Sequence, residues 1–254
     1  MLGGQLTYYL LGAQARLAYK HNYELFKIRA TLGHLVASAL ALAGTAGARA
    51  DAASLGTLAL VDGLLACYSA VAYWMMLGRE SVLRMNGSNI RGWWFLHHGL
   101  GMAMSGMLVV MHKDAAWHGR GADGTGTALP LRVRMIVFYI YLCLVQYFQF
   151  RYQQSRLYAL RALSRISPME TTNELAQNAI HHRLMFLLPW LLAAYAMQFA
   201  LAVSFVRGAT RADRCVVGLL LLVMAVGNCA TTLYTIYNKR PASSKGGPEP
   251  ERAC

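Results

Sequence analysis

Long apolar stretches alternate with short polar segments along most of the chain. An α-helix needs about 20 predominantly apolar residues to cross the hydrocarbon core of a bilayer, and six of the stretches have a length near that value. The pattern therefore predicts an all-α polytopic membrane protein. Its six transmembrane helices are expected over residues 26–46, 55–77, 95–111, 133–150, 184–206 and 215–237.

The segments outside these stretches have patterns of their own. Residues 1–26 space apolar side chains at helical intervals, which predicts a short amphipathic helix at the membrane surface or leading into the first span. Residues 27–238 form the six-helix transmembrane domain. Residues 239–254 are rich in Pro, Gly and Ser, which predicts a disordered cytosolic tail. A further amphipathic surface helix is expected in the first half of the polar segment 151–183, before Pro168.

Composition agrees with a membrane protein. Hydrophobic residues make up 56% of the chain and charged residues 14%, whereas soluble domains carry about 25% charged residues. The net charge of +13 would suit a nucleic-acid partner, but the basic residues flank the apolar stretches and form no nucleic-acid-binding motif. Basic cytoplasmic loops of a membrane protein explain the charge better. We therefore expect membrane lipids, and no nucleic acid, as partners.

The basic residues also predict an orientation. Six spans place both termini on the same side of the membrane, and sixteen of the 24 Lys and Arg residues lie in the segments on that side. The positive-inside bias then places both termini and the loop 80–92 in the cytosol. The sequon Asn86-Gly87-Ser88 is accordingly expected to stay unglycosylated.

The stretch 80–98 is the best candidate for a functional site. It consists of the polar sequence ESVLRMNGSNIRG followed by WWFLHH at the start of the third apolar stretch. Trp rings favour the headgroup level, and imidazoles below it need a hydrogen bond, a ligand or a wet cavity. On a helix His97 and His98 lie about 100° apart, while Trp94 precedes them by three and four residues and shares their side. The spacing indicates an aromatic and imidazole cluster rather than a metal site; an aromatic belt with two hydrogen-bonded histidines is the alternative.

The five cysteines add no second candidate. They show no CxxC spacing, and most lie inside apolar stretches, where Cys behaves as a small hydrophobic residue. We expect neither a disulfide framework nor a metal centre.

Several polar residues lie within the predicted spans. One or two would be ordinary hydrogen bonds between helices, but so many near the cytosolic ends favour a polar cavity open to the cytosol. Basic residues at 151, 156 and 161 would surround its mouth, which suits a ligand with phosphates at one end and a thin chain at the other. Plain packing remains the other interpretation. The polar residues are His97, His98, Ser105, Gln146, Gln149 and Asn228, with Arg29 and Asp62 nearer the helix ends.

Three separated motifs carry a resemblance to a known family. They are ESVLRMNGSNIRGWWFLHH, LVQYFQFRYQQSRLYALRALS and GNCATTLYTIYNKR, and AYKHNYELFKIR before the first span matches as well. In these motifs the chain resembles the TACAN/TMPIT-like membrane proteins, the transmembrane protein 120 family. The resemblance covers about residues 18–240.

The resemblance implies a fold and a ligand. The family fold is a barrel of six helices around a tunnel, similar to the very-long-chain fatty acid elongases. Members bind coenzyme A in the tunnel from the cytosolic side, and this implies coenzyme A or an acyl-CoA as the ligand here, with no metal. They are usually homodimers of endoplasmic reticulum and nuclear envelope membranes with a link to lipid metabolism. A homodimer through membrane helices is therefore expected.

The resemblance also assigns residues. Trp94, His97 and His98 would flank the pantetheine and nucleotide path. Elongases have a third histidine at the position of Trp94, and an indole can stack but cannot transfer protons as imidazole does. Elongase-type condensation is therefore left open, although His97 and His98 are placed to polarise a thioester. The residues expected to add polar contacts to the ligand are Asn86, Ser105, Gln146, Gln149, Tyr158, Arg161 and Asn228.

Two other functions fit the sequence less well than coenzyme A binding. A mechanosensitive ion channel or channel modulator needs a continuous polar stripe or rings of charge, and the polar residues cluster toward one side instead. A non-catalytic scaffold at the nuclear envelope or endoplasmic reticulum needs an interaction module. The coiled coil that members usually carry before the first span is missing from this sequence, where about two dozen residues precede that span. Coenzyme A binding is the favoured prediction.

Overall fold

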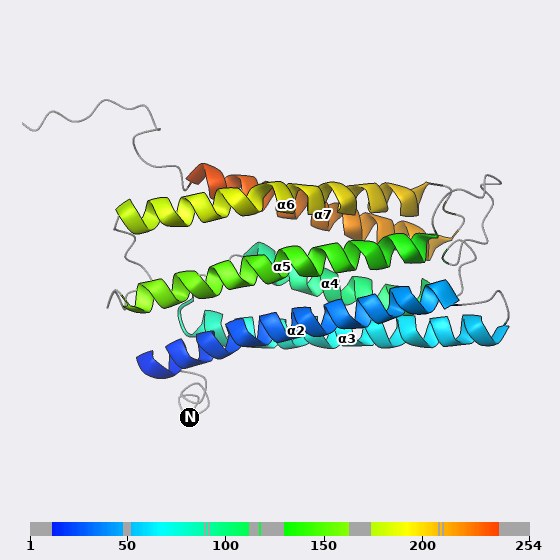
Figure 1. Ribbon diagram of the computed structural model, residues 1–254, viewed down its shortest axis with the longest axis horizontal. Helices are drawn as coiled ribbons and strands as arrows, with labels where there is room; N and C mark the ends of the chain where they lie inside the picture. Colours follow the sequence, from blue (N-terminus) through cyan, green and yellow to red (C-terminus); the bar gives the residue numbers. More distant parts are fainter. Residues whose placement is uncertain are drawn as a thin grey trace, which may run out of the picture.

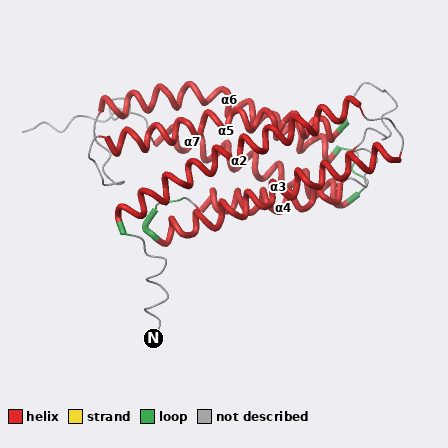
Figure 2. The backbone as a smooth tube through the Cα atoms, turned by 60° about the horizontal axis from the view of Figure 1, so that its bottom comes forward, coloured by secondary structure: helices red, strands yellow, loops and turns green. Residues whose placement is uncertain are grey.

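The computed structural model describes residues 12–47, 52–88, 90, 92–111, 117, 130–162, 174–207, 209 and 211–238. This part of the chain is helical and contains no strand. The helices lie side by side along one direction (Figures 1 and 2). Their bounds are α2 Ala13–Gly47, α3 Ala52–Met85, α4 Gly92–Val110, α5 Leu131–Ala162, α6 Glu174–Val206 and α7 Ala212–Asn238.

Five of the six described helices are long and apolar enough to cross a membrane. The prediction of an all-α, multi-pass membrane protein is therefore confirmed. The helix outside this group is α4, the predicted third span, whose 19 residues extend about 28 Å. That length is close to the roughly 30 Å of a hydrocarbon core, and the helix carries His97 and His98 in its first half.

Four helices extend well beyond the predicted spans. α3 continues to Met85 and α6 begins at Glu174, and α2 and α5 extend furthest. α2 runs without interruption from Ala13 to Gly47, so from residue 13 onward the amphipathic segment leads directly into the first span, the second of the two arrangements predicted for it. α5 likewise continues to Ala162, so the start of the amphipathic helix predicted in the segment 151–183 is continuous with the fourth span. Neither extension contains Gly or Pro, and a helix without these residues has no local reason to stop. Pro168 lies outside the described residues.

The main helix contacts form a closed order. α2 packs against α3 and α5, α3 packs against α4, α4 against α7, α7 against α6, and α6 against α5. Following these contacts leads from α2 through α3, α4, α7, α6 and α5 back to α2. At the α3–α4 contact, a Cβ added to Gly101 would come within 2.7 Å of the Tyr73 ring, so glycine permits this close approach.

We call the two ends of the bundle the Asp62 end and the histidine end. The Asp62 end contains Asp62 near the start of α3; the histidine end contains Glu80, His97 and His98, at the left in Figure 1. Glu80 lies 18 residues after Asp62 along α3, which corresponds to about 27 Å.

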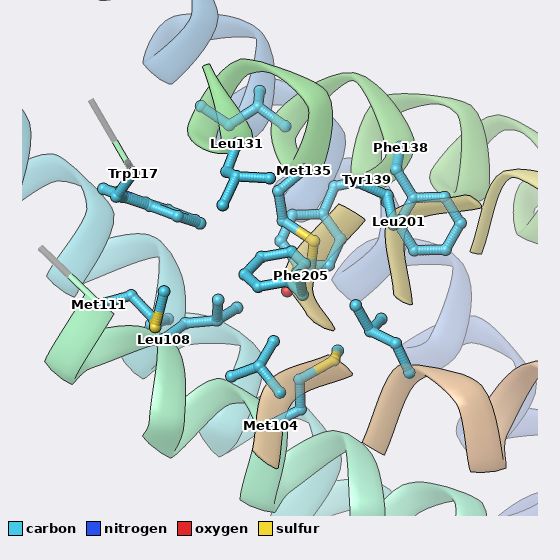
Figure 3. Close-up of a cluster of buried hydrophobic side chains, with 14 of the residues drawn as sticks. Met104, Leu108, Met111, Trp117, Leu131, Met135, Phe138, Tyr139, Leu201 and Phe205 are labelled. Carbon is cyan, nitrogen blue, oxygen red and sulfur yellow. The ribbon is translucent and has the colours of Figure 1, made fainter. Parts of the chain in front are cut away.

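One hydrophobic core joins all six helices between the Asp62 end and the middle of the bundle. Figure 3 shows Phe205 of α6 in the centre of its labelled side chains, with Met135 of α5 on one side and Leu108 of α4 on the other. Phe205 is fully buried. Methionine suits such an irregular interior because its unbranched side chain fills gaps.

The hydrophobic contacts are divided at the histidine end. Tyr23, Met76 and Leu83 form one buried cluster between α2 and α3. Val145, Leu187 and Leu191 form another between α5 and α6. These two pairs of helices lie on different sides of the closed order, so the described buried side chains form no single core across this end.

Candidate functional site

A helical hairpin places the candidate residues close together. α3 ends at Met85, Asn86 and Gly87 form a turn, and α4 begins at Gly92. Gly87 has a φ of +83°, a left-handed conformation that glycine adopts without the steric cost of a Cβ. Glu80 lies five residues before the end of α3 and His98 six residues after the start of α4, so the reversal brings them opposite one another.

Glu80 is the centre of a buried hydrogen-bond network. The His98 Nδ1 atom lies 2.9 Å from Glu80 Oε2, and the Tyr23 hydroxyl donates a 2.7 Å hydrogen bond to Glu80 Oε1. Glu80 is 7% exposed and Tyr23 is 3% exposed. The network joins α2, α3 and α4, and both carboxyl oxygens are engaged.

His97 lies beside this network and has a different environment. It is buried, and its Nδ1 atom has no hydrogen-bond partner among the described residues. Its ring faces the Trp94 ring edge-on with centroids 5.8 Å apart and lies 5.4 Å from the His98 ring. The predicted cluster of Trp94, His97 and His98 is therefore present as a set of ring contacts.

Trp93 connects the cluster to α7. Its Nε1 donates a 3.1 Å hydrogen bond to Asn228 Oδ1. The neighbouring Gly227 lies directly beneath the indole, since a Cβ there would overlap the Trp93 ring. Asn228 therefore belongs to the same end of the bundle as the histidines, and its amide oxygen orients Trp93.

Lys27 completes the described polar groups on the α2 and α5 side. Its ammonium group lies 2.8 Å from Glu24 and donates a 2.8 Å hydrogen bond to Gln153 Oε1 on α5. It also lies over the Tyr23 ring at 4.9 Å and the Phe150 ring at 4.8 Å. A buried ammonium ion requires partners of this kind to offset its lost hydration.

In the half of the bundle that includes the histidine end, each pair of neighbouring helices is joined by at least one hydrogen bond from a side chain. Two further bonds extend the series: the hydroxyls of Tyr195 (α6) and Thr232 (α7) lie 2.8 Å apart, and the Tyr141 hydroxyl (α5) donates to the Trp190 carbonyl (α6) at 3.0 Å. Together with the four contacts above, these bonds follow the order of the helices around the bundle. None of these bonds involves the buried His97 Nδ1 atom, which has no partner among the described residues.

Other predicted residues are placed less directly. Ser105 is buried, but its hydroxyl donates to the Gly101 carbonyl of its own helix at 2.9 Å. Asn86 Nδ2 donates to the Val82 carbonyl at 2.8 Å, which supports the end of α3. Gln146 and Gln149 are half-buried on α5, and a role for these four residues in ligand binding stays a prediction. The side chains of Tyr158 and Arg161 lie outside the described residues.

Glu80, Tyr23 and Lys27 are site residues that the sequence argument did not assign. Glu80 offered a signal, because it is a single carboxylate directly after the apolar stretch of α3 and before the two histidines. Tyr23 and Lys27 offered none, because their partners lie 57 and 126 residues away. Arg29, one of the polar residues noted within the predicted spans, is exposed.

Asp62 belongs to a separate network at the other end. Arg132 of α5 binds it with Nη2 2.7 Å from Oδ1, and Trp117 Nε1 donates to Oδ2 at 2.9 Å. Arg132 also donates to the Thr45 hydroxyl. The Arg132 side chain is 1% exposed. α3 and α5 flank α2 in the helix order, so this network reaches between helices that are not direct neighbours.

The sequence is similar to a group of membrane proteins. A model described as TMEM120A/B matches residues 1–243. Transmembrane protein 120B from Danio rerio is 31% identical over 242 residues, which are 93% of this chain and 65% of that protein. Transmembrane protein 120A from Xenopus tropicalis is 33% identical with the same shares. The Drosophila melanogaster homologue is 30% identical, with 56% of its own length covered. The chain thus spans between about half and two thirds of these curated relatives.

Proposed function

The chain belongs to the TMEM120A/B family, and we propose that it binds coenzyme A or an acyl-CoA within its helix bundle, at the histidine end. The proposal includes a cytosolic position for this end and an endoplasmic reticulum or nuclear envelope membrane as its location. It also includes a link to lipid metabolism. It concerns binding, and it assigns no reaction.

The unpartnered Nδ1 atom of His97 is the observation that carries the proposal. A buried polar atom without a hydrogen bond costs about 1–3 kcal/mol, and native proteins leave few such atoms. His97 is 9% exposed and lies against the Trp94 ring. An imidazole nitrogen beside an indole suits a ligand with polar groups along a thin chain, such as the amide-containing arm of coenzyme A.

The arrangement of hydrogen bonds around this end supports an interior site. The hydrogen bonds connect each helix to its neighbours around the bundle. The buried hydrophobic side chains at this end form two separate clusters, one between α2 and α3 and one between α5 and α6. The closed helix order is also what a barrel around a tunnel, as in the elongases, would require. A ligand entering between the two clusters would meet His97 and Trp94.

Basic side chains near the same end are available to bind the phosphate groups of the proposed ligand. The Arg79 guanidinium lies 4.6 Å from the centre of the Phe26 ring, and Arg84 lies 5.7 Å from that of Phe95. Arg151 is exposed at the corresponding end of α5. Arginine binds phosphate through charge-assisted, often bidentate hydrogen bonds, so the nucleotide part of the ligand is expected on this side.

The Asp62 end counts against the ion-channel alternative. A conducting path along the bundle would have to pass the shared hydrophobic core and the buried network of Asp62 and Arg132. Channels instead line a continuous path with polar groups, charged rings or a gate that can open. The packed half favours a site that opens at one end only.

Titration of detergent-purified protein with coenzyme A tests the proposal. Trp94→Ala and His97→Ala are each expected to weaken binding by about tenfold or more, because truncating an anchor in a buried site typically costs a few kcal/mol. Trp74→Ala and His21→Ala are the matched controls, since Trp74 is 64% exposed and His21 is exposed. Equal affinity of all four variants and the unmodified protein would contradict the assignment of the site.

A further inference from the structure

The two oxygens of Glu80 receive hydrogen bonds from two different helices. Tyr23 on α2 donates to Oε1 at 2.7 Å, and His98 Nδ1 on α4 lies 2.9 Å from Oε2. The Tyr23 hydroxyl, by donating to Oε1, leaves Oε2 turned toward the histidine. The His98 and Glu80 side chains are 12% and 9% exposed, so water competes little for this contact.

The chemistry of the pair determines which His98 nitrogen carries a proton. An ionised carboxylate can only accept hydrogen bonds, so the imidazole nitrogen facing it must carry hydrogen. A neutral imidazole carries one ring proton, and its other nitrogen is then an acceptor. In the neutral form of His98, with the proton on Nδ1, the Nε2 atom presents a lone pair. Nε2 makes no hydrogen bond to any residue in the part of the chain that the structure describes.

We infer that Glu80 and Tyr23 are positioning residues that hold the proton of His98 on Nδ1, so that Nε2 accepts a hydrogen bond from a donor on the bound ligand. The donor would be an amide N–H or a thiol S–H. The inference rests on the proposed function for the identity of the ligand, because coenzyme A contains both groups. His97 and His98 then have distinct roles, since His97 offers its own unpartnered Nδ1 and His98 offers Nε2.

A merely structural role for Glu80 would be different. In that case the residue would only tie α2, α3 and α4 together, and glutamine, which has the same shape, would replace it well. For the inferred role glutamine is a poor replacement. The Tyr23 hydroxyl would donate to the amide oxygen, the amide N–H₂ group would face His98, and Nδ1 would have to become the acceptor. The ring proton would then move to Nε2.

Nitrogen-15 NMR of the full chain with labelled histidine distinguishes these roles. The chain has eight histidines, and the signal of His98 is identified by its loss in His98→Gln. The expected spectrum shows a protonated Nδ1 and an unprotonated Nε2 in the unmodified protein, with the proton moved wholly or largely to Nε2 in Glu80→Gln. A proton on Nε2 in the unmodified protein, or a spectrum unchanged by Glu80→Gln, overturns the inference.

Titration with coenzyme A is the second test of the inference. Glu80→Gln is expected to reduce affinity about tenfold while leaving the unfolding temperature within a few degrees of the unmodified protein. Asp213→Asn serves as the charge control, since Asp213 pairs with Arg211 at the start of α7, at the Asp62 end. Unchanged affinity in Glu80→Gln overturns the assignment of Nε2 to the ligand. If the unmodified protein binds no coenzyme A, the proposed function fails, and the NMR spectra still decide the protonation of His98.

Discussion

The two ends of the bundle each contain buried charges, but they satisfy them differently. At the Asp62 end, Asp62 and Arg132 join α3 to α5, beyond the nearest neighbour of each helix. At the histidine end, the hydrogen bonds connect neighbouring helices, and the buried Nδ1 atom of His97 has no partner among the described residues. The first network supplies donors to both carboxyl oxygens of Asp62. The second leaves a polar atom available, as a binding site would.

The difference also concerns what surrounds each network. Trp117 packs into the core shared by all six helices while its Nε1 bonds to Asp62, so the ion pair and the core support one another. Glu80 instead bonds to Tyr23 of the small cluster between α2 and α3, which is separate from the cluster between α5 and α6. We conclude that one half of the bundle contributes mainly stability, and that the other half contributes the candidate site.

The largest effect is expected from breaking the ion pair at the Asp62 end. Asp62→Leu leaves the Arg132 guanidinium buried without its counter-charge, and removing one partner of a buried pair typically costs about 3–5 kcal/mol. The loss is measured as a reduced free energy of unfolding in detergent. Replacing both partners, as in Asp62→Leu with Arg132→Met, should recover most of it.

A control for this prediction is the pair of Arg211 and Asp213. The Arg211 side chain is 43% exposed, and such pairs contribute about 0–1 kcal/mol. Asp213→Ala should therefore leave the unfolding free energy nearly unchanged. A loss in Asp62→Leu no larger than that in Asp213→Ala would show that the Asp62 end is not the stabilising half.

A smaller effect is expected where α4 meets α7 at the histidine end. In Gly227→Ala the new methyl group would overlap the Trp93 ring, so the indole must move and lose its hydrogen bond to Asn228. Overpacking of this kind costs about 1–3 kcal/mol. Coenzyme A binding should fall together with stability, because Trp93 and His97 lie one turn apart on α4.

The matched variant is Gly106→Ala on α4. A Cβ there meets no atom within 4 Å, and alanine is the better helix former by about 1 kcal/mol. This variant should keep its affinity for coenzyme A and be equally or more stable. If both variants behave alike, close packing of Trp93 on Gly227 is not required at this end.

The smallest effect is expected from a single hydrogen bond between neighbouring helices. Tyr195→Phe removes the hydroxyl that lies 2.8 Å from the Thr232 hydroxyl. Hydrogen bonds between membrane helices contribute about 0.6 kcal/mol on average, so the unfolding free energy should fall by about that amount. Tyr147→Phe, at a residue whose ring contacts Phe148, provides the comparison and should show no loss. Equal losses would indicate a packing effect of the ring substitution instead.

The sequence predicted the helices and part of the site well. Apolar stretches of the right length predicted all six helices, and the spacing of Trp94, His97 and His98 predicted their cluster. The helix ends were less predictable, because the segments after Ala13 and before Ala162 contain no residue that stops a helix. Hydrogen-bond partners that lie on different helices could not be predicted from the sequence. Trp93 and Asn228 are 135 residues apart, and only the packing order of α4 and α7 brings them together.

Native mass spectrometry of the detergent-purified chain, before and after mild heating, shows whether the helix bundle holds a small molecule. We expect a bound mass equal to coenzyme A or an acyl-CoA that is released on heating. The mass should be retained in His21→Ala and reduced in His97→Ala. A stable protein that carries no such mass, and gains none when coenzyme A is added, would contradict the claim that the histidine end is a coenzyme A site.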